Sequence, residues 1–179
     1  MSTGKNLKGL IRPLLIVACM GASYGDADEF KAVGRCPEIR GTQTAPTSYL
    51  GRTNPLSPTA ENRAAGARLY QDDARPTPCV TCHGVLGDGQ GPAAAYLNPA
   101  PRNFRCRSTM LDIPDGQLYW VIEQGSGELH HPARQGAQHL GRPGRTQTVT
   151  AMRSYGDYLT EEEIWQLVLY IRSLANETD

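Results

Sequence analysis

Apolar residues recur at the spacing of an α-helix in three segments of the chain, residues 57–71, 114–125 and 160–174. The third segment carries the clearest pattern, with one face formed by Ile164, Leu167, Val168 and Ile171. No segment shows the sustained alternation of apolar and polar residues that is typical of a half-buried strand. The pattern therefore predicts an all-α protein.

Signals at the ends of these segments agree with the three helices. Thr160 and Glu163 have the spacing of a capping box, and Gly125 stands where the second helix should end. Residues 74–113 and 126–150 lie between the helices and are predicted to be rich in loops.

The first 18 residues have the pattern of an export signal. A positively charged segment with Lys5, Lys8 and Arg12 comes first. The apolar run that follows, residues 13–18, is far shorter than the ~20 residues needed to span a bilayer. The run ends in Ile-Val-Ala-Cys, which resembles the lipobox of bacterial lipoproteins, in which the cysteine becomes the lipidated N-terminus. We therefore expect lipidation at Cys19 and a location on the periplasmic side of a bacterial membrane. A plain secretory signal, cleaved a few residues later, is the alternative.

Composition then suggests a division of the chain into three parts. A signal peptide (1–18) is followed by an extended N-terminal arm or tether (19–58), rich in Gly, Pro, Thr and Ser, and by one domain (59–176). Without the signal peptide, the chain has 15 basic and 18 acidic groups. A chain without excess positive charge is not expected to bind nucleic acid.

The sequence Cys-Val-Thr-Cys-His at residues 79–83 is the strongest chemical motif. A structural zinc site needs four ligands, usually in two spaced pairs, and the chain has no second Cys-x-x-Cys. A thioredoxin-like dithiol belongs to a βαβ unit, and no strand is predicted. Cys-x-x-Cys-His is the attachment signature of c-type haem, in which Cys79 and Cys82 form thioethers and His83 binds the iron. The motif predicts one covalent haem c.

At this motif the chain resembles the class I c-type cytochromes of bacteria, over roughly residues 60–174. The likeness includes AAGARLY before the motif, GDGQGPAA and PRNF after it, DGQLYWVIEQGS, and EEEIWQLVLYIRSL near the end. The resemblance implies a small, loop-rich domain wrapped around one haem. It also implies that the first and last helices cross closely, with Gly66 and Tyr70 meeting Leu167 and Tyr170.

The resemblance also suggests Met152 as the second axial ligand of the iron. As in the family, an aromatic residue, Tyr155, follows three positions later, and a short polar turn leads into the last helix. His131 in GSGELHHPA is the rival, because this segment resembles the family's Met-Pro loop; His130 and His139 are weaker candidates. His131 lies 29 residues before the helix cap at Thr160, whereas Met152 lies eight before it, so we expect residues 129–150 to be an insertion.

Two further residues are assigned roles beside the haem. Met110, ahead of a helix, is expected to pack near the haem edge. The resemblance also suggests that the carbonyl of Pro92 accepts the proton of the second ring nitrogen of His83, with Pro99 and Pro101 as rivals.

The cysteine count leaves one pair unassigned. The chain has five cysteines, of which Cys19 is assigned to lipid and two to haem, so Cys36 and Cys106 remain. In an oxidising compartment this pair predicts a disulfide between the arm and the domain. Two free buried thiols are the alternative.

An iron held by His83 and Met152 has no open position for a substrate, so the predicted function is the transfer of one electron between exported redox proteins. The alternative is a catalytic haem protein, or a haem subunit of a periplasmic dehydrogenase or oxidase that acts on a small substrate. Seven arginines between residues 100 and 155 suggest an acidic protein partner. These are Arg102, Arg105, Arg107, Arg134, Arg142, Arg145 and Arg153. Their pairing with haem propionates or local carboxylates is the alternative.

Overall fold

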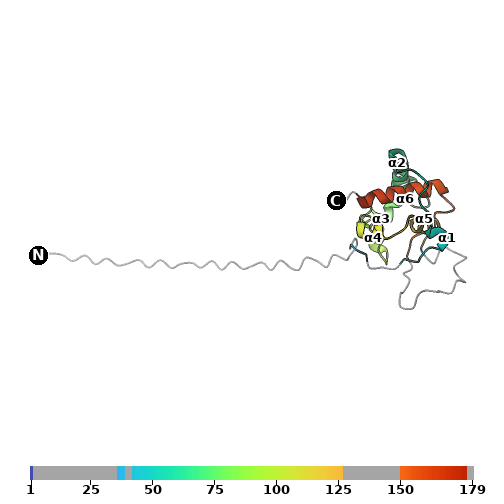
Figure 1. Cartoon of the computed structure of the whole chain (residues 1–179). Coiled ribbons are helices and arrows are strands. Elements are labelled where there is room, and N and C mark those ends of the chain that lie inside the picture. Colours follow the sequence, from blue (N-terminus) through green and yellow to red (C-terminus); the bar gives the residue numbers. More distant parts are fainter. Residues whose placement is uncertain (2–35, 39–41, 127–149, 177–179) are drawn as a thin grey trace. The chain divides into compact units, whose positions relative to one another are not determined.

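The computed structural model describes residues 1, 36–38, 42–126 and 150–176 (Figure 1). Its helical elements are, in chain order, α1 (Thr47–Leu50), α2 (Ala60–Arg68), the π-helical turn η1 (Leu69–Asp73), α3 (Val80–His83), the 3-10 turn η2 (Ala94–Tyr96), α4 (Arg107–Leu111), α5 (Asp115–Gln124) and α6 (Glu161–Asn176). These ranges contain helices and loops and no strand. The predicted all-α class is confirmed.

Helix α2 starts later than the sequence pattern predicted and ends in a wider turn. The hydroxyl of Thr59 accepts a hydrogen bond from the N–H of Asn62 at 3.1 Å, which caps the helix before Ala60. The chain then continues through η1, where the N–H of Ala74 donates to the carbonyl of Leu69 five residues earlier, at 3.1 Å. This turn brings Tyr70 into the core with none of its surface exposed.

Helices α2 and α6 cross at Gly66 with almost no space between their backbones (Figure 1). A Cβ on Gly66 would lie 2.1 Å from the carbonyl oxygen of Gln166, so only glycine allows this approach. Beyond the crossing, the rings of Tyr70 and Tyr170 meet edge to face with their centroids 5.1 Å apart. Leu167, three residues before Tyr170 in α6, is completely buried.

The ends of α5 and α6 follow the predicted signals. The N–H of Glu163 donates to the Thr160 hydroxyl, and the N–H of Thr160 donates to the Glu163 carboxylate at 2.8 Å, which forms the capping box of α6. Gly125 ends α5 with a φ of +68°, a backbone conformation that favours glycine. Arg172 of α6 pairs with Asp115 at the first position of α5 and so joins the two helices.

Residues 42–58, which were predicted to belong to a tether, instead pack on the domain. The N–H of Ala45 donates to the side-chain oxygen of Gln117 at 2.7 Å, and the amide of Asn54 donates to the Trp165 carbonyl at 2.9 Å. Helix α1 lies so close to α5 that a Cβ on Gly116 would fall 1.8 Å from the Tyr49 carbonyl oxygen. The expected boundary at residue 58 is therefore not a structural boundary.

Arg52 holds this segment in place from inside an aromatic cluster. Its guanidinium carbon lies 4.3 Å from the ring centroid of Tyr119 and 5.2 Å from that of Trp165, within the range of a cation–π interaction. The same guanidinium pairs with Glu161 at the start of α6. One side chain thus binds the N-terminal segment to both α5 and α6.

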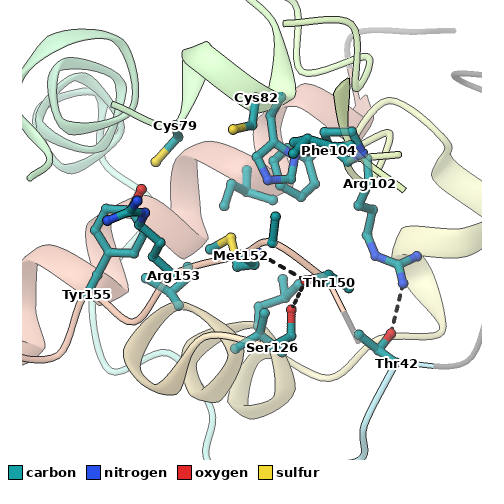
Figure 2. A pocket seen from close by; sticks show the side chains of 18 of the residues that line it. Thr42, Cys79, Cys82, Arg102, Phe104, Ser126, Thr150, Met152, Arg153 and Tyr155 are labelled. Carbon is teal, nitrogen blue, oxygen red and sulfur yellow. Dashed lines mark hydrogen bonds between the residues drawn. The ribbon is translucent and has the colours of Figure 1, made fainter. Parts of the chain in front are cut away.

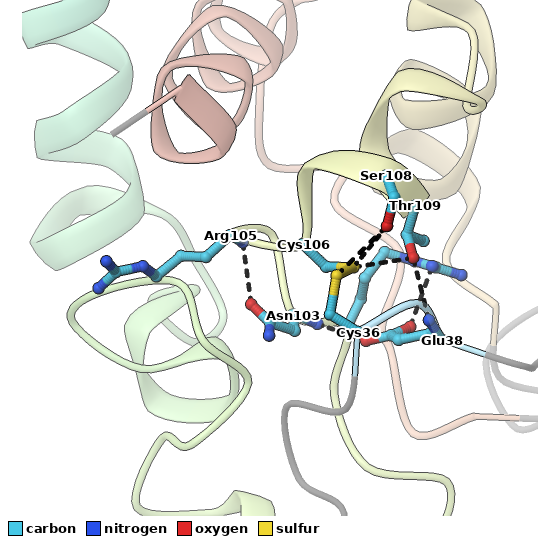
Figure 3. Close-up of a disulfide and its surroundings, with 8 residues drawn as sticks. Cys36, Glu38, Asn103, Arg105, Cys106, Ser108 and Thr109 are labelled. Atoms are coloured by element: carbon cyan, nitrogen blue, oxygen red, sulfur yellow. Dashed lines mark hydrogen bonds and ion pairs between the residues drawn. A yellow bond between two sulfur atoms is a disulfide. The ribbon is translucent and has the colours of Figure 1, made fainter. Parts of the chain in front are cut away.

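A disulfide joins Cys36 to Cys106, the two cysteines that remained after the lipid and haem assignments (Figure 3). It connects the beginning of the described N-terminal segment to the residue before α4. Cys19 and the expected signal peptide lie outside the described residues. Within the described ranges, no helix has the length and apolar character needed to cross a membrane.

We predict that Gly66→Ala lowers the free energy of unfolding by about 1–3 kcal/mol, because the new methyl group forces α2 and α6 apart. The measurement is chemical denaturation followed by circular dichroism. Gly51→Ala is the matched control, since its Cβ would meet no atom closer than 4.0 Å. Equal stability of the Gly66→Ala and Gly51→Ala proteins would contradict the importance of the crossing.

Candidate functional site

A largely apolar cavity of about 160 Å³ lies between α3, α5, α6 and the chain around Met152 (Figure 2). One water requires only about 10–15 Å³ of such space, so the cavity can take a much larger group. Cys79, Cys82 and His83 line one side, and Met152 lines the cavity from a segment about seventy residues later. Apolar side chains complete the wall: Leu97, Phe104, Ile113, Leu118, Ile122 and Ile171.

The one-turn helix α3 brings the two cysteines to the same side. Residues three apart in a helix share a face, so the side chains of Cys79 and Cys82 both reach the cavity (Figure 2). The helix ends at Gly84, which has a φ of +79° and whose carbonyl accepts a hydrogen bond from Tyr70 at 2.8 Å. The loop then turns tightly at Asp88, whose carboxylate accepts the N–H of Gln90 at 3.0 Å.

The two thiols of the motif are not bonded to each other or to another cysteine. Burial raises the pKa of Cys79 to about 12, with a smaller contribution from neighbouring Cys82. Burial also raises the pKa of Cys82, although the positive charge of Arg153 acts in the opposite direction. A site that disfavours thiolates suits sulfur in a neutral form, such as a thioether. The cysteine pair therefore fits covalent attachment of a haem.

His83 is buried, and its ring is held on two sides by the loop of residues 102–104. Its Nδ1 lies 3.0 Å from the carbonyl oxygen of Arg102, and because a carbonyl can only accept, Nδ1 carries the proton. The ring of Phe104 stacks on the imidazole at 4.3 Å between centroids and 16° between planes. The other nitrogen, Nε2, is then unprotonated in the neutral ring and is the one suited to bind a metal.

The carbonyl beside His83 belongs to Arg102 and not to Pro92, so the role assigned to Pro92 was wrong. The N–H groups of Gly91 and Ala93 donate to the carbonyls of Cys82 and Thr81, at 3.1 and 2.9 Å, which ties this turn to α3 and leaves Pro92 exposed. The rivals Pro99 and Pro101 line the cavity, and the accepting carbonyl follows directly after Pro101.

Met152 is positioned by the end of α5 and by the loop before the motif. Its carbonyl accepts the N–H of Ser126 at 3.1 Å, and its own N–H donates to the hydroxyl of Thr150 at 3.1 Å. Three residues later, the hydroxyl of Tyr155 donates to the Thr77 carbonyl at 2.6 Å. Figure 2 shows the Met152 side chain inside the cavity, across from the two cysteines.

The other ligand candidates fall elsewhere. Met110 precedes α5 as predicted, but it lies within α4, is fully buried in the core, and is not one of the residues that line the cavity. Its expected place at the haem edge was therefore wrong. His130, His131 and His139 lie outside the described residues, as does nearly all of the expected insertion.

The charge of Arg102 is paired locally. Its Nη1 lies 3.0 Å from a carboxylate oxygen of Glu38, and both side chains are 11% exposed. Its Nη2 donates to the hydroxyl of Thr42 at 2.9 Å (Figure 2). For Arg102, the structure therefore agrees with the alternative prediction, in which the arginine pairs with a local carboxylate and not with a protein partner. Arg134, Arg142 and Arg145 lie outside the described residues.

Comparison with known proteins identifies the class of protein. The sequence model of the cytochrome c family matches residues 63–175, more than half of the chain, and the chain therefore belongs to the cytochrome c family. Membership of this family implies haem-based electron transfer. The family match begins inside α2 and ends inside α6, so it spans the helix crossing and every residue that lines the cavity except Thr42.

No curated protein matches the chain significantly. Among solved structures it is similar to a chain of the reducing HAO-like protein complex of Kuenenia stuttgartiensis, with 23% sequence identity and a TM-score of 0.46. The similarity covers 70% of this chain and 48% of that chain, so the present chain matches about half the length of its structural relative.

Proposed function

We propose that the protein carries one electron on a single haem c, attached covalently at Cys79 and Cys82. The observation that supports this most strongly is the convergence of these two thiols, His83 and Met152 on one apolar cavity. When bound, the haem iron supplies a centre that alternates between the ferric and ferrous states. The two thiols would hold the edge of the cofactor, and His83 and Met152 would bind its iron.

The residues around the cavity suit rapid electron transfer between protein partners. The Arg102 carbonyl and the Phe104 ring fix the orientation of His83, and hydrogen bonds on both sides of Met152 fix its backbone. Two ligands held in this way leave no position for a substrate and change little between oxidation states. A catalytic role would require the Met152 position to be open or labile.

We predict that Cys79→Ala and Cys82→Ala each reduce covalent haem and that the double variant has none, because each change removes one thioether. Haem staining after denaturing electrophoresis provides the measurement. The control is Cys36→Ser with Cys106→Ser, which removes two cysteines outside the motif and should retain covalent haem. A stoichiometric covalent haem in the Cys79/Cys82 double variant would exclude attachment at this motif.

We predict that Met152→Ala removes the far-red sulfur-to-iron absorption band of the oxidised protein. It should also lower the reduction potential, since a thioether ligand favours the ferrous state. Absorption spectra during a redox titration measure both effects. Met110→Leu is the control, because Met110 is buried in the core, and His131→Ala should leave both properties nearly unchanged. The reverse result, with His131→Ala altering the spectrum, would assign the ligand to the histidine.

We further propose that the protein is exported and anchored by a lipid on Cys19, at the periplasmic face of a bacterial membrane, where it serves nearby redox proteins. The packing of residues 42–58 and the bond at Cys36 limit any tether to the residues between Cys19 and Cys36. Even fully extended, such a segment spans no more than about 60 Å. The haem domain would therefore stay beside one complex.

If this proposal holds, Cys19→Ala releases the protein from the membrane fraction into the soluble fraction, provided that another cleavage site is used. Cell fractionation followed by haem staining measures the distribution, and mass spectrometry of the N-terminus detects the acyl chain. A wild-type protein that is fully soluble and carries no acyl chain would refute the anchor while leaving the haem assignment intact.

A further inference from the structure

Glu38 contacts both the chain between the haem motif and α4 and the helix α4 itself. One carboxylate oxygen accepts the N–H of Asn103 at 2.6 Å, and the other lies 3.0 Å from Nη1 of Arg102. The N–H of Glu38 itself donates to the hydroxyl of Thr109 in α4 at 3.0 Å. Figure 3 shows Glu38 between Asn103 and Thr109, two residues from the disulfide.

The loop that Glu38 holds is the same loop that holds His83. Arg102 provides the carbonyl for Nδ1 of His83, and Phe104 provides the stacked ring. Asn103 lies between these two contacts, and its N–H is the group bonded to Glu38. A displacement of Asn103 would therefore disturb both contacts of the imidazole at once.

The N-terminal segment that carries Glu38 is itself fixed independently of the haem motif. The disulfide at Cys36 ties it to Cys106, and the Thr42 hydroxyl accepts a further hydrogen bond from Arg102. Glu38 and Arg102 are both nearly buried, and charge-assisted hydrogen bonds in such surroundings are stronger than those in water. These contacts hold Glu38 against the loop that carries Arg102 and Asn103.

We propose that Glu38 is a positioning residue for the axial ligand His83, acting through the backbone of Arg102 and Asn103. This inference rests on the proposed function, because it assumes that His83 binds a haem iron. A firm hydrogen bond from Nδ1 increases electron donation by the imidazole, which favours ferric iron and lowers the reduction potential. Loss of Glu38 should weaken that bond and raise the potential.

The test compares Glu38→Ala with Glu38→Gln in the full-length, haem-loaded protein. Glutamine keeps an oxygen that can accept the Asn103 N–H, whereas alanine keeps none. A role through position therefore separates the two variants, whereas a role through charge alone affects them equally. Asp112→Asn is the matched control, because it also removes one negative charge, at an exposed site just after α4.

Two measurements are made on each variant. The first is the solvent exchange rate of the His83 Nδ1 proton in the reduced protein, followed by nuclear magnetic resonance. The second is the reduction potential. Glu38→Ala should accelerate the exchange on the order of tenfold and raise the potential. Glu38→Gln should exchange at nearly the wild-type rate, with a smaller rise in potential, and Asp112→Asn should match the wild type in both.

Equal acceleration in the alanine and glutamine variants, or no acceleration in either, would overturn the proposal. If Glu38→Ala does not fold, Cys36→Ser with Cys106→Ser releases the same segment while Glu38 remains, and it should change both measurements in the same direction. No change in that protein would also overturn the inference. Failure of the proposed function is recognised separately, because the wild-type protein would then lack the covalent haem itself.

Discussion

The contact between Gly66 and the backbone of α6 fixes the frame in which the cavity is built. Because the two helix axes come so close, the end of α2 and the turn η1 have one position relative to α6. Tyr70, at the end of this path, reaches the carbonyl of Gly84 and so places the end of the haem motif. From the other side of the crossing, α6 contributes Ile171 to the cavity wall. A steric constraint at one residue thus sets the distance between the motif and the opposite wall.

The two proposed axial ligands are supported in different ways. His83 is held by a loop that is buried under the N-terminal segment, through hydrogen bonds that involve the charged pair of Glu38 and Arg102. Met152 is held by neutral hydrogen bonds of its own backbone, and the hydroxyl of Tyr155, three residues later, donates to the Thr77 carbonyl. A change in charge near the N-terminal segment is therefore expected to affect His83, whereas the position of Met152 depends on the end of α5. Under the proposed function, this asymmetry would give two separate structural routes for tuning the haem.

The sequence predicted the helices whose apolar residues are periodic, and it missed the elements that only tertiary contacts define. The capping box at Thr160 and the stop at Gly125 are local signals, and both were confirmed. Helix α1 has four residues and no periodic face, and it is held by its approach to Gly116 in a distant helix. For the site, the motif residues could be selected by their spacing, and Met152 by the resemblance to the class I cytochromes. The Arg102 carbonyl beside His83 could not be predicted, because its position depends on how a proline-rich loop folds back.

The disulfide places a requirement on the maturation of the protein. Four of its cysteines lie in the described residues, and four thiols can form a single disulfide in six ways. Only the pairing of Cys36 with Cys106 leaves both motif thiols free, yet Cys79 and Cys82 are close in sequence and would form a bond first in an oxidising compartment if nothing prevented it. If the protein is exported and carries haem at the motif as proposed, the outer pair would have to be oxidised while the inner pair is kept reduced in the same chain. Its biogenesis would then require a reductant directed at one dithiol and an oxidant that spares it.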